Sequence, residues 1–380
     1  MSQLFNTQKK IGVLGAGQLG RMLHQSAINL NIDLYMMDSS SDAPCASLIH
    51  NYTIGDLEDF DDVYKFGKQC EILTIEIEKV NIEALKLLQS EGVKVFPQPE
   101  VIEIIQDKRT QKQFYLDHHI PTAAFVLTER KEDIMNHLDM LPAVHKIGKG
   151  GYDGRGVQMV KEATDIEKAF NAPSLLEKMI PFEKEIAVIV ARNESGETSA
   201  FPPVEMVFHP EHNLVEYLLS PAIVSKEQMV RAENLAMEVI EKLEMVGILA
   251  VEMFLLGNGE LLVNEVAPRP HNSGHQSIEG NFTSQYDQHL RTILNLPLGD
   301  TRIKITSAMV NILGEEGFNG EAEYEGLSDV LAISGTHVHL YGKKVTKPFR
   351  KMGHVTITDP NLESLRKKIG QVKALLKVKA

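Results

Sequence analysis

The chain has 380 residues, of which 43% are hydrophobic and 24% charged, and its 52 acidic residues exceed its 39 basic ones to give a net charge of −13. These values exclude disorder, collagen and coiled coil as descriptions of the whole chain, and the length predicts two or three domains. The acidic balance argues against a nucleic-acid-binding protein, and only two cysteines exclude a disulfide framework and suit a reducing, cytoplasmic compartment.

The N-terminus lacks the pattern of a signal peptide, and no segment reaches about 18 consecutive apolar residues. We therefore expect a soluble protein without a membrane span. The first 100 residues alternate between apolar runs and helical patterns. The predicted strands are 11–14, 34–37, 72–75 and 93–96, and the predicted helices are 18–30, 59–68 and 82–90. This alternation indicates an α/β unit with a parallel sheet and crossover helices, punctuated at its end by Pro97 and Pro99.

The pattern changes after Asp107. A predicted helix at 108–118 is followed by predicted strands at 143–146, 157–160, 174–179, 186–190 and 206–209. A predicted helix at 226–243 and a hairpin of strands at 248–256 and 261–266 come next. Residues 301–380 are predicted to form short strands and one final helix. Ser225 and Gln228 form a capping-box pattern before the long helix, and Asn258-Gly259 indicates the hairpin turn. The remainder of the chain is therefore predicted to mix α and β structure.

The first motif is Gly15-Ala16-Gly17-Gln18-Leu19-Gly20, between a predicted strand and a predicted helix. It matches G-x-G-x-x-G, and Asp38 ends the next strand, as in dinucleotide-binding units. Such a turn aims backbone N–H groups and a helix N-terminus at an anion. The motif alone leaves open a dinucleotide site and a glycine turn of any doubly wound sheet.

A second glycine-rich segment runs from Lys146 to Gly156, between two predicted strands. Its backbone N–H groups could fold over a polyphosphate, while Lys146 pairs with phosphate as a point charge. No Gly-Lys-Ser/Thr closes the segment, so it is not a P-loop. The alternative is a mobile surface hairpin.

Two glutamates of the predicted hairpin face each other if the turn centres on Asn258-Gly259, because Glu252 then pairs with Glu265. Like charges placed opposite each other destabilise a sheet unless they share a cation. Magnesium held by one or two carboxylates and nucleotide phosphates is such a case. The alternative is two exposed glutamates on a solvated face.

Two polar segments follow. Arg269-Pro270-His271-Asn272-Ser273-Gly274-His275 comes directly after the second glutamate strand and collects hydrogen-bond donors suited to an oxyanion such as bicarbonate or phosphate. The run from Lys343 to His354 is basic in an acidic protein. It is either a solvated loop or a site that captures a phosphorylated substrate.

A glycine-rich loop with a preceding lysine, followed by two carboxylates on adjacent strands, resembles the ATP-grasp ligases. Within them, residues 150–156, 264–275 and 350–354 resemble the N5-carboxyaminoimidazole ribonucleotide synthetases, and residues 15–23 match that family's N-terminal domain. The resemblance implies an ATP-grasp fold in three parts. These are a Rossmann-like parallel-sheet domain (1–106), an ATP-grasp domain (107–298) with a lid at about 107–180, and a small β-rich C-terminal domain (299–380).

The resemblance also implies that ATP and Mg²⁺ bind in the central part, with Glu252 and Glu265 as the metal ligands. The implied nucleotide contacts are Lys108, Lys146, Gly151, Tyr152, Asp153, Gly154, Arg155, Gly156, Val157, Glu177, Lys178, Met179, Ile180, Glu185, Phe208, Asn264 and Glu265. Two positions depart from the family pattern. Lys108 stands where relatives often carry arginine, and His145 stands where the strand residue is usually apolar.

The implied reaction joins bicarbonate to 5-aminoimidazole ribonucleotide through carboxyphosphate and converts ATP to ADP and phosphate, a step of purine biosynthesis. The implied catalytic residues are Tyr152, Arg269, His271, Asn272 and Lys351, the first four around bicarbonate. The implied substrate contacts are Gly17, Gln18, Leu19, Glu76, Arg350 and Lys351. Either Glu76 or Glu78, at the end of a predicted strand, would take the ribose hydroxyls. The family leads us to expect a homodimer.

Three alternatives stay open at this point. The first glycine motif and Asp38 would suit an NAD-dependent oxidoreductase. The second glycine segment would also suit a nucleotide-binding module without catalysis. A related transformylase that uses formate would share most of the motifs.

Overall fold

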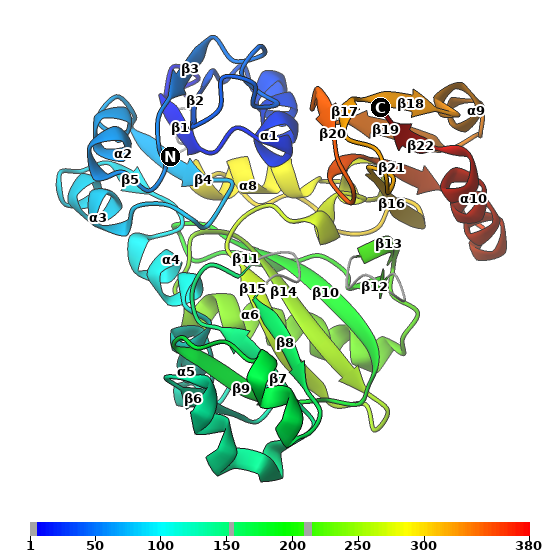
Figure 1. The fold of residues 1–380 in the computed structure, drawn as a ribbon. Helices are drawn as coiled ribbons and strands as arrows, with labels where there is room; N and C mark the ends of the chain where they lie inside the picture. Colours follow the sequence, from blue (N-terminus) through cyan, green and yellow to red (C-terminus); the bar gives the residue numbers. More distant parts are fainter. Residues whose placement is uncertain (1–5, 152–155, 209–214) are drawn as a thin grey trace.

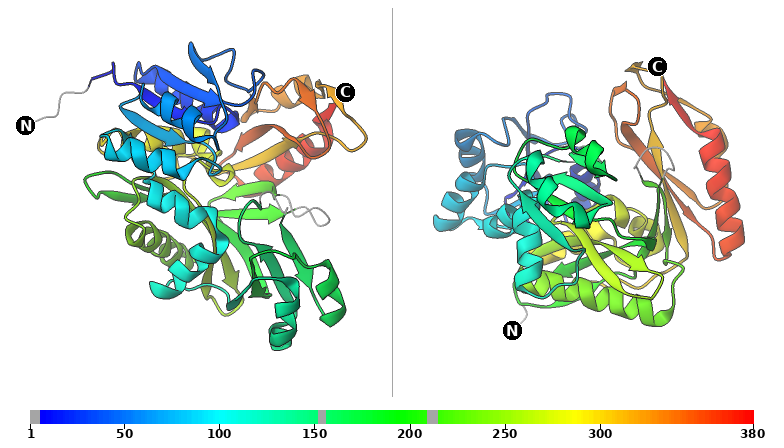
Figure 2. Two further views of the ribbon diagram at one scale, coloured as in Figure 1. Left: turned by 60° about the vertical axis from the view of Figure 1, so that its left-hand side comes forward. Right: turned by 60° about the horizontal axis from the view of Figure 1, so that its bottom comes forward.

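The computed structural model of the chain describes residues 6–151, 156–208 and 215–380. Figure 1 shows the N-terminal and C-terminal parts above a central part that carries the longest strands, and Figure 2 gives two further views of this arrangement. Lys344 of the C-terminal part and Asp42 of the N-terminal part form an ion pair across this border. No helix within the described ranges is long and apolar enough to cross a membrane.

The N-terminal part is built on a parallel sheet with strand order β3-β2-β1-β4-β5. Its strands are β1 (Ile11–Leu14), β2 (Leu34–Asp38), β3 (Asn51–Ile54), β4 (Ile72–Ile75) and β5 (Lys94–Val95), and its helices are α1 (Gln18–Asn29), α2 (Phe60–Gly67), α3 (Ile82–Ser90) and α4 (Pro99–Gln106). The central strand β1 is buried on both faces, with Val13 in one apolar cluster and Leu14 in another. Burial on both faces is typical of a parallel sheet covered by crossover helices, so the predicted architecture is confirmed.

Two elements of this part lie outside the sequence prediction. β3 is an edge strand with only partly covered residues, so it lacks the continuous apolar run that indicates a buried strand. Pro99 does not end the unit but begins α4. Proline fits the first turn of a helix because its missing N–H has no partner there.

The segment predicted as the lid contains a four-stranded antiparallel sheet in the order β6-β9-β7-β8. Its elements are α5 (Lys108–Asp117), β6 (Phe125–Thr128), η1 (Lys131–Met140), β7 (Ala143–Ile147), β8 (Val157–Val160), η2 (Ala163–Lys168) and β9 (Ser174–Lys178). The 3-10 helices η1 and η2 pack on the sheet through a small apolar cluster that includes Ile134, Ile166 and Leu176. The sequence predicted neither these two helices nor β6.

His145 lies on β7 with no exposed surface. Its Nδ1 accepts the backbone N–H of Phe170 at 3.2 Å, and its Nε2 lies 3.0 Å from the hydroxyl of Thr128. Because Nδ1 accepts, the neutral ring carries its proton on Nε2 and donates it to Thr128. A neutral histidine therefore joins three segments of the lid, which explains why this polar residue occupies a core position.

We expect the lid to lose stability between pH 6.5 and pH 4. Burial lowers the pKa of His145 from 6.5 to about 4, so the unfolded chain takes up a proton in this window more readily than the folded chain. The stabilisation present above pH 6.5 is then lost as the pH falls, by up to about 3 kcal/mol. Hydrogen exchange of the β7 and β8 amides measures this loss. In His145→Leu the pH-dependent part should vanish; a retained slope would assign it to another group.

The central sheet is antiparallel and has nine strands in the order β15-β14-β10-β12-β13-β16-β21-β19, with β11 added beside β10. Its strands are β10 (Phe182–Arg192), β11 (Thr198–Ala200), β12 (Val204–Phe208), β13 (Val215–Ser220), β14 (Gly247–Leu256), β15 (Leu261–Ala267), β16 (Ser307–Leu313), β19 (Thr336–Leu340) and β21 (Lys351–Thr358). The predicted strand at 206–209 corresponds to β12, and His209 lies outside the described residues. β11 and β13 were not predicted.

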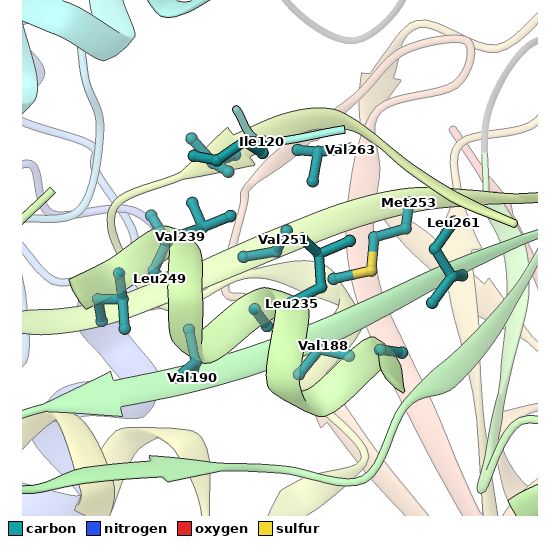
Figure 3. Close-up of a cluster of buried hydrophobic side chains, with 14 of the residues drawn as sticks. Ile120, Val188, Val190, Leu235, Val239, Leu249, Val251, Met253, Leu261 and Val263 are labelled. Carbon is teal, nitrogen blue, oxygen red and sulfur yellow. The ribbon is translucent and has the colours of Figure 1, made fainter. Parts of the chain in front are cut away.

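Helix α6 (Lys226–Lys242) covers one face of this sheet and begins at the predicted capping box of Ser225 and Gln228. Figure 3 shows its Leu235 and Val239 packed against side chains of β10, β14 and β15, including Val188 and Val251. This cluster is the largest apolar core of the described chain. It fixes the hairpin that carries the predicted glutamate pair.

The C-terminal part continues the central sheet, because β13 pairs with β16 across the predicted domain border at 298. The three-domain division therefore stays a prediction. The remaining elements are η3 (Asn272–Gly274), α7 (Ser277–Gly280), α8 (Gln285–Ile293), β17 (Gly320–Glu321), β18 (Glu323–Glu325), α9 (Leu327–Leu331), β20 (Val345–Thr346), α10 (Leu362–Leu375) and β22 (Lys377–Lys379). The prediction of one helix after residue 301 is wrong, since the short α9 precedes α10. The sequence did not predict α8, because buried polar residues such as Gln288 and Thr292 interrupt its apolar pattern.

Candidate active site

The glutamate pair predicted on the hairpin is present: Glu252 of β14 lies opposite Glu265 of β15. The predicted turn centre is wrong, however, because near the turn Met253 pairs with Val263, one residue out of the predicted register. A β-bulge between these two pairs shifts the register by one residue and restores the pairing of the glutamates.

The bulge also decides which way the glutamate points. Leu261 and Val263 face the core under α6, and beyond the bulge Val266 faces the same core. Strict alternation along β15 would have placed Glu265 on the side of Val263. With the bulge, Asn264 and Glu265 both contact lysines of the lid region, on the face that carries Glu252.

Lys108, in the first turn of α5, balances one of the two carboxylates. Its Nζ lies 2.5 Å from Glu265 Oε2 and holds the pKa of Glu265 below its usual range. Burial, and then the charge of Glu265, raise the pKa of Glu252, whose Oε1 lies 3.6 Å from His271 Nε2. The Glu265 side chain remains 42% exposed, so a cation from solvent can reach it. A divalent cation between the carboxylates would favour the charged form of both.

No group of three or more His, Cys, Asp or Glu within the described ranges could hold a metal. The donor set at this point is therefore two carboxylates. Mg²⁺ prefers six oxygen ligands and usually takes most of them from water and nucleotide phosphates. Two opposed carboxylates fit that ion better than they fit a metal enclosed by protein ligands.

Lys146, on β7, is held against the same strand as Glu265. Its Nζ donates to Asn264 Oδ1 at 3.0 Å and lies 3.1 Å from Glu177 Oε2. Glu177, on β9, is 3% exposed and also faces Lys112, whose Nζ is 3.4 Å from the same oxygen. The carboxylate of Glu177 thus faces two lysines. Burial and the charge of Glu265 raise the pKa of nearby Glu185 to about 7.

The other predicted nucleotide contacts lie on the ends of the lid strands and on β12. Four of them lie outside the described ranges: Tyr152, Asp153, Gly154 and Arg155. Gly151 precedes this stretch and Gly156 follows it. Val157 begins β8, Lys178 ends β9 and is followed by Met179 and Ile180, and Phe208 ends β12. Met179 is exposed. An exposed apolar side chain directly after β9 is suited to cover a nucleotide base.

The Arg269–His275 loop, which follows β15, is held in place by hydrogen bonds to its backbone. Gln285 of α8 accepts the N–H of His271 and donates to its carbonyl, both at 2.8 Å. Arg269 pairs with Glu78 at 2.9 Å, and its Nε, like Asn272 Oδ1, is buried without a hydrogen-bond partner in the described part of the chain. Buried polar atoms usually find partners, so these two are suited to a small polar ligand.

In the first glycine motif, a side chain of the same protein occupies the place where an anion would bind. Glu76, which follows β4, accepts the backbone N–H of Gly17 at 2.5 Å and that of Gly20. A Cβ at Gly15, Gly17 or Gly20 would collide with the Glu76 side chain. The motif's glycines are therefore explained by a carboxylate of the same chain. Burial raises the pKa of Glu76 to about 7, although the two N–H donors act in the opposite direction.

The predicted substrate contacts are dispersed in the structure. Gln18 and Leu19 begin α1 beside Glu76. Lys351 begins β21, and its charge is close enough to act on the pKa of Glu252. The Arg350 guanidinium instead donates to the carbonyl of Val345 within the basic run, at 2.5 Å. The charge of Lys351 thus acts on the glutamate pair, and the Arg350 guanidinium is held by its own loop.

Two residues of this region were missed by sequence reasoning: Lys112 and Gln285. Lys112 lies one helical turn after Lys108 on α5, so a second lysine at that spacing could have indicated it. Gln285 acts through hydrogen bonds with the backbone of His271, which lies 14 positions away in the sequence. No local pattern marks such contacts.

Family models match three consecutive parts of the chain. They are a ribonucleotide synthetase preATP-grasp domain at residues 8–106, an ATP-grasp domain at 113–286 and a phosphoribosylaminoimidazole carboxylase C-terminal domain at 307–368. The N5-carboxyaminoimidazole ribonucleotide synthase of Bacillus subtilis is 36% identical over 91% of this chain and 90% of that relative. The chloroplastic phosphoribosylaminoimidazole carboxylase of Vigna aconitifolia is 38% identical, but the chain spans 65% of its length.

Solved structures agree over nearly the whole chain. The N5-carboxyaminoimidazole ribonucleotide synthetase of Thermotoga maritima is 39% identical with a TM-score of 0.91, covering 98% of this chain and 100% of that one. The Aspergillus clavatus synthase, in complex with ADP and 5-aminoimidazole ribonucleotide, is 32% identical with a TM-score of 0.88, covering 97% and 98%. The similarity therefore includes all three parts of the fold.

Proposed function

Because the chain belongs to the N5-carboxyaminoimidazole ribonucleotide synthase family, we propose that it joins bicarbonate to the amino group of 5-aminoimidazole ribonucleotide while ATP is converted to ADP and phosphate. The observation that carries the proposal is the opposed pair of Glu252 and Glu265, placed between two lysines and the Arg269–His275 loop. The proposed metal–phosphate site and the proposed oxyanion loop would thus adjoin each other.

The chemistry requires this arrangement. Bicarbonate is a poor electrophile, so ATP first phosphorylates it to carboxyphosphate and leaves as ADP. The amine then attacks the carboxyl carbon, or carbon dioxide released from it; phosphate leaves and the amine gives up one proton. Carboxyphosphate breaks down quickly in water, so the site must exclude water until the amine arrives.

On the nucleotide side, Lys146 and Lys108 would meet the phosphates, and Glu252 and Glu265 would hold Mg²⁺. When bound, the ion would supply positive charge that offsets the charge of the phosphates. Support comes from the Aspergillus clavatus structure solved with ADP and from a second structure of that enzyme solved with ATP. The role of Tyr152 as a lid residue stays a prediction.

On the substrate side, Arg269, His271 and Asn272 would surround bicarbonate, and Lys351 with Arg350 would meet the phosphate of the ribonucleotide. Glu76 or Glu78 would take its ribose hydroxyls, and Gly17 to Leu19 would lie on the same side of the cleft. The unpartnered Nε of Arg269 and Oδ1 of Asn272 support the first assignment. A homodimer in the cytoplasm stays a prediction from the family.

One assay tests the proposal. The protein is incubated with ATP, Mg²⁺, bicarbonate and 5-aminoimidazole ribonucleotide, and both phosphate and carboxylated product are measured. We expect equal amounts of the two, and turnover that needs bicarbonate and the ribonucleotide. Turnover with formate in place of bicarbonate would favour a transformylase, and ATP binding without turnover would favour a binding module.

We expect NAD⁺ not to bind. The Glu76 carboxyl group occupies the N–H groups of Gly17 and Gly20 that would face a pyrophosphate, so a dinucleotide finds no free donors there. In a thermal melt, ATP with Mg²⁺ should raise the melting temperature, whereas NAD⁺ at about 1 mM should not. Stabilisation by NAD⁺ alone would revive the oxidoreductase alternative.

A further inference from the structure

Lys112 is a buried lysine that the proposed reaction does not use. Its side chain is 3% exposed, and it is the one lysine among the fully buried residues of the described chain. Ammonium groups are almost never buried without a charged partner, because leaving water costs them several kcal/mol. Its position next to the nucleotide site therefore calls for a specific role.

The contacts of Lys112 tie the lid to the strand that carries Glu265. Its Nζ lies 3.4 Å from Glu177 Oε2 and contacts the hydroxyl of Thr122. That hydroxyl donates to the carbonyl of Val263 at 2.6 Å, and Val263 immediately precedes the bulge. Lys112 thus connects Glu177 on β9 with β15 at the point where β15 turns Asn264 and Glu265 toward the site.

Glu177 is shared between two ammonium groups, since Lys146 Nζ lies 3.1 Å from the same oxygen. With Lys146 alone, this buried carboxylate would form a neutral pair. With Lys112 as well, the three groups carry one net positive charge. Lys112 is closed off, whereas the Lys146 side chain is 13% exposed beside Asn264, so the unbalanced charge is presented by Lys146. Burial lowers the pKa of Lys112 to about 8, which leaves it mostly protonated at pH 7.

We propose that Lys112 is a positioning residue for nucleotide binding: it neutralises Glu177 and so leaves the charge of Lys146 available to the phosphates of ATP. The inference rests on the proposed function, because it assumes that a polyphosphate meets Lys146. It adds a residue that touches neither nucleotide nor substrate.

The first variant is Lys112→Met, which keeps the buried stem and removes the charge. We expect the Kd for ATP with Mg²⁺, measured by calorimetry, to rise about tenfold. The kcat at saturating ATP should stay within about threefold of wild type, because the reacting groups are untouched. An unchanged Kd would overturn the inference.

The second variant adds Glu177→Gln to Lys112→Met. Both buried charges are then gone and Lys146 regains an unbalanced charge, so the Kd should return to within about threefold of wild type. If Lys112 only supported packing, or if Glu177 itself bound the nucleotide, the second substitution would weaken binding further, which would overturn the inference. Should Lys112→Met fail to fold, the double variant, which removes both buried charges, decides alone on the same criterion.

Lys184→Met is the matched control. Lys184 of β10 pairs with Glu205 at 2.8 Å and alternates with Glu185, so it points to the face covered by α6. Its loss should leave the Kd for ATP unchanged; an equal loss there would assign the effect to net charge and contradict a local role of Lys112. If the wild-type protein does not bind ATP, the proposed function is contradicted. If the wild-type protein and Lys112→Met bind ATP with the same Kd, only this inference is contradicted.

Discussion

Glu265→Gln should reduce kcat/KM by about a thousandfold or more while the protein stays folded. The amide keeps the shape of the side chain but lacks the charge with which the proposed Mg²⁺ site holds the ion between β14 and β15. Glu252 alone, whose burial disfavours its charged form, should hold the ion much less well. Turnover at saturating Mg²⁺, measured as product formed, checks this result.

Stability should barely change in the same variant. Lys108 loses the partner that its Nζ meets at 2.5 Å, which is unfavourable, but Glu252 loses a neighbouring like charge, which is favourable. Because Glu265 is 42% exposed, each effect is moderate, and we expect the free energy of unfolding to change by less than about 1 kcal/mol. Denaturant titration of the nucleotide-free protein measures it.

Glu260→Gln is the control for this experiment. Glu260 lies in the turn of the same hairpin, is exposed, and accepts a hydrogen bond from Asn258 at 2.9 Å. Its replacement should leave turnover unchanged. Activity that survives in Glu265→Gln, or a melting temperature that collapses, would contradict the assignment of Glu265 as a metal ligand.

The glutamate pair shows how far a sequence pattern reaches. Alternating apolar residues and an Asn-Gly turn were enough to predict two facing strands and the pairing of Glu252 with Glu265. That pairing follows from a regular hydrogen-bond ladder and a turn centred on Asn258-Gly259, whereas the structure has a different turn centre and a compensating bulge. A bulge depends on how Val263 and Val266 both reach the core under α6, and a local pattern does not contain that information.

The first glycine motif shows the opposite case. Its spacing predicts a tight turn that offers N–H groups to an anion, and the structure has that turn. Which anion occupies it is decided by Glu76, 56 and 59 residues away from the two donors. The same limit applies to Gln285 and the His271 loop. Residues that bind through sequence-distant backbone are found only once the fold brings them together.

Arg269→Lys should lower the rate of product formation by about a hundredfold while the Kd for ATP stays within about twofold of wild type. Lysine retains the positive charge and can still pair with Glu78, which Arg269 meets at 2.9 Å. It cannot offer the planar fork of donors, and the Nε that lies buried without a partner in the described structure is lost. The substitution should therefore weaken interactions with the oxyanion and leave those with ATP intact.

Measuring product and phosphate in one reaction separates the possible roles of Arg269. If the arginine binds bicarbonate, both should fall together, because no carboxyphosphate forms. If it acts on the intermediate, phosphate should exceed product, since carboxyphosphate would be lost to water. Glu78→Gln is the matched control: it removes the other half of the ion pair but keeps the guanidinium, so product formation should fall less than in Arg269→Lys. A rise in the Kd for ATP equal to the fall in rate would move Arg269 to the nucleotide side and refute its place beside bicarbonate.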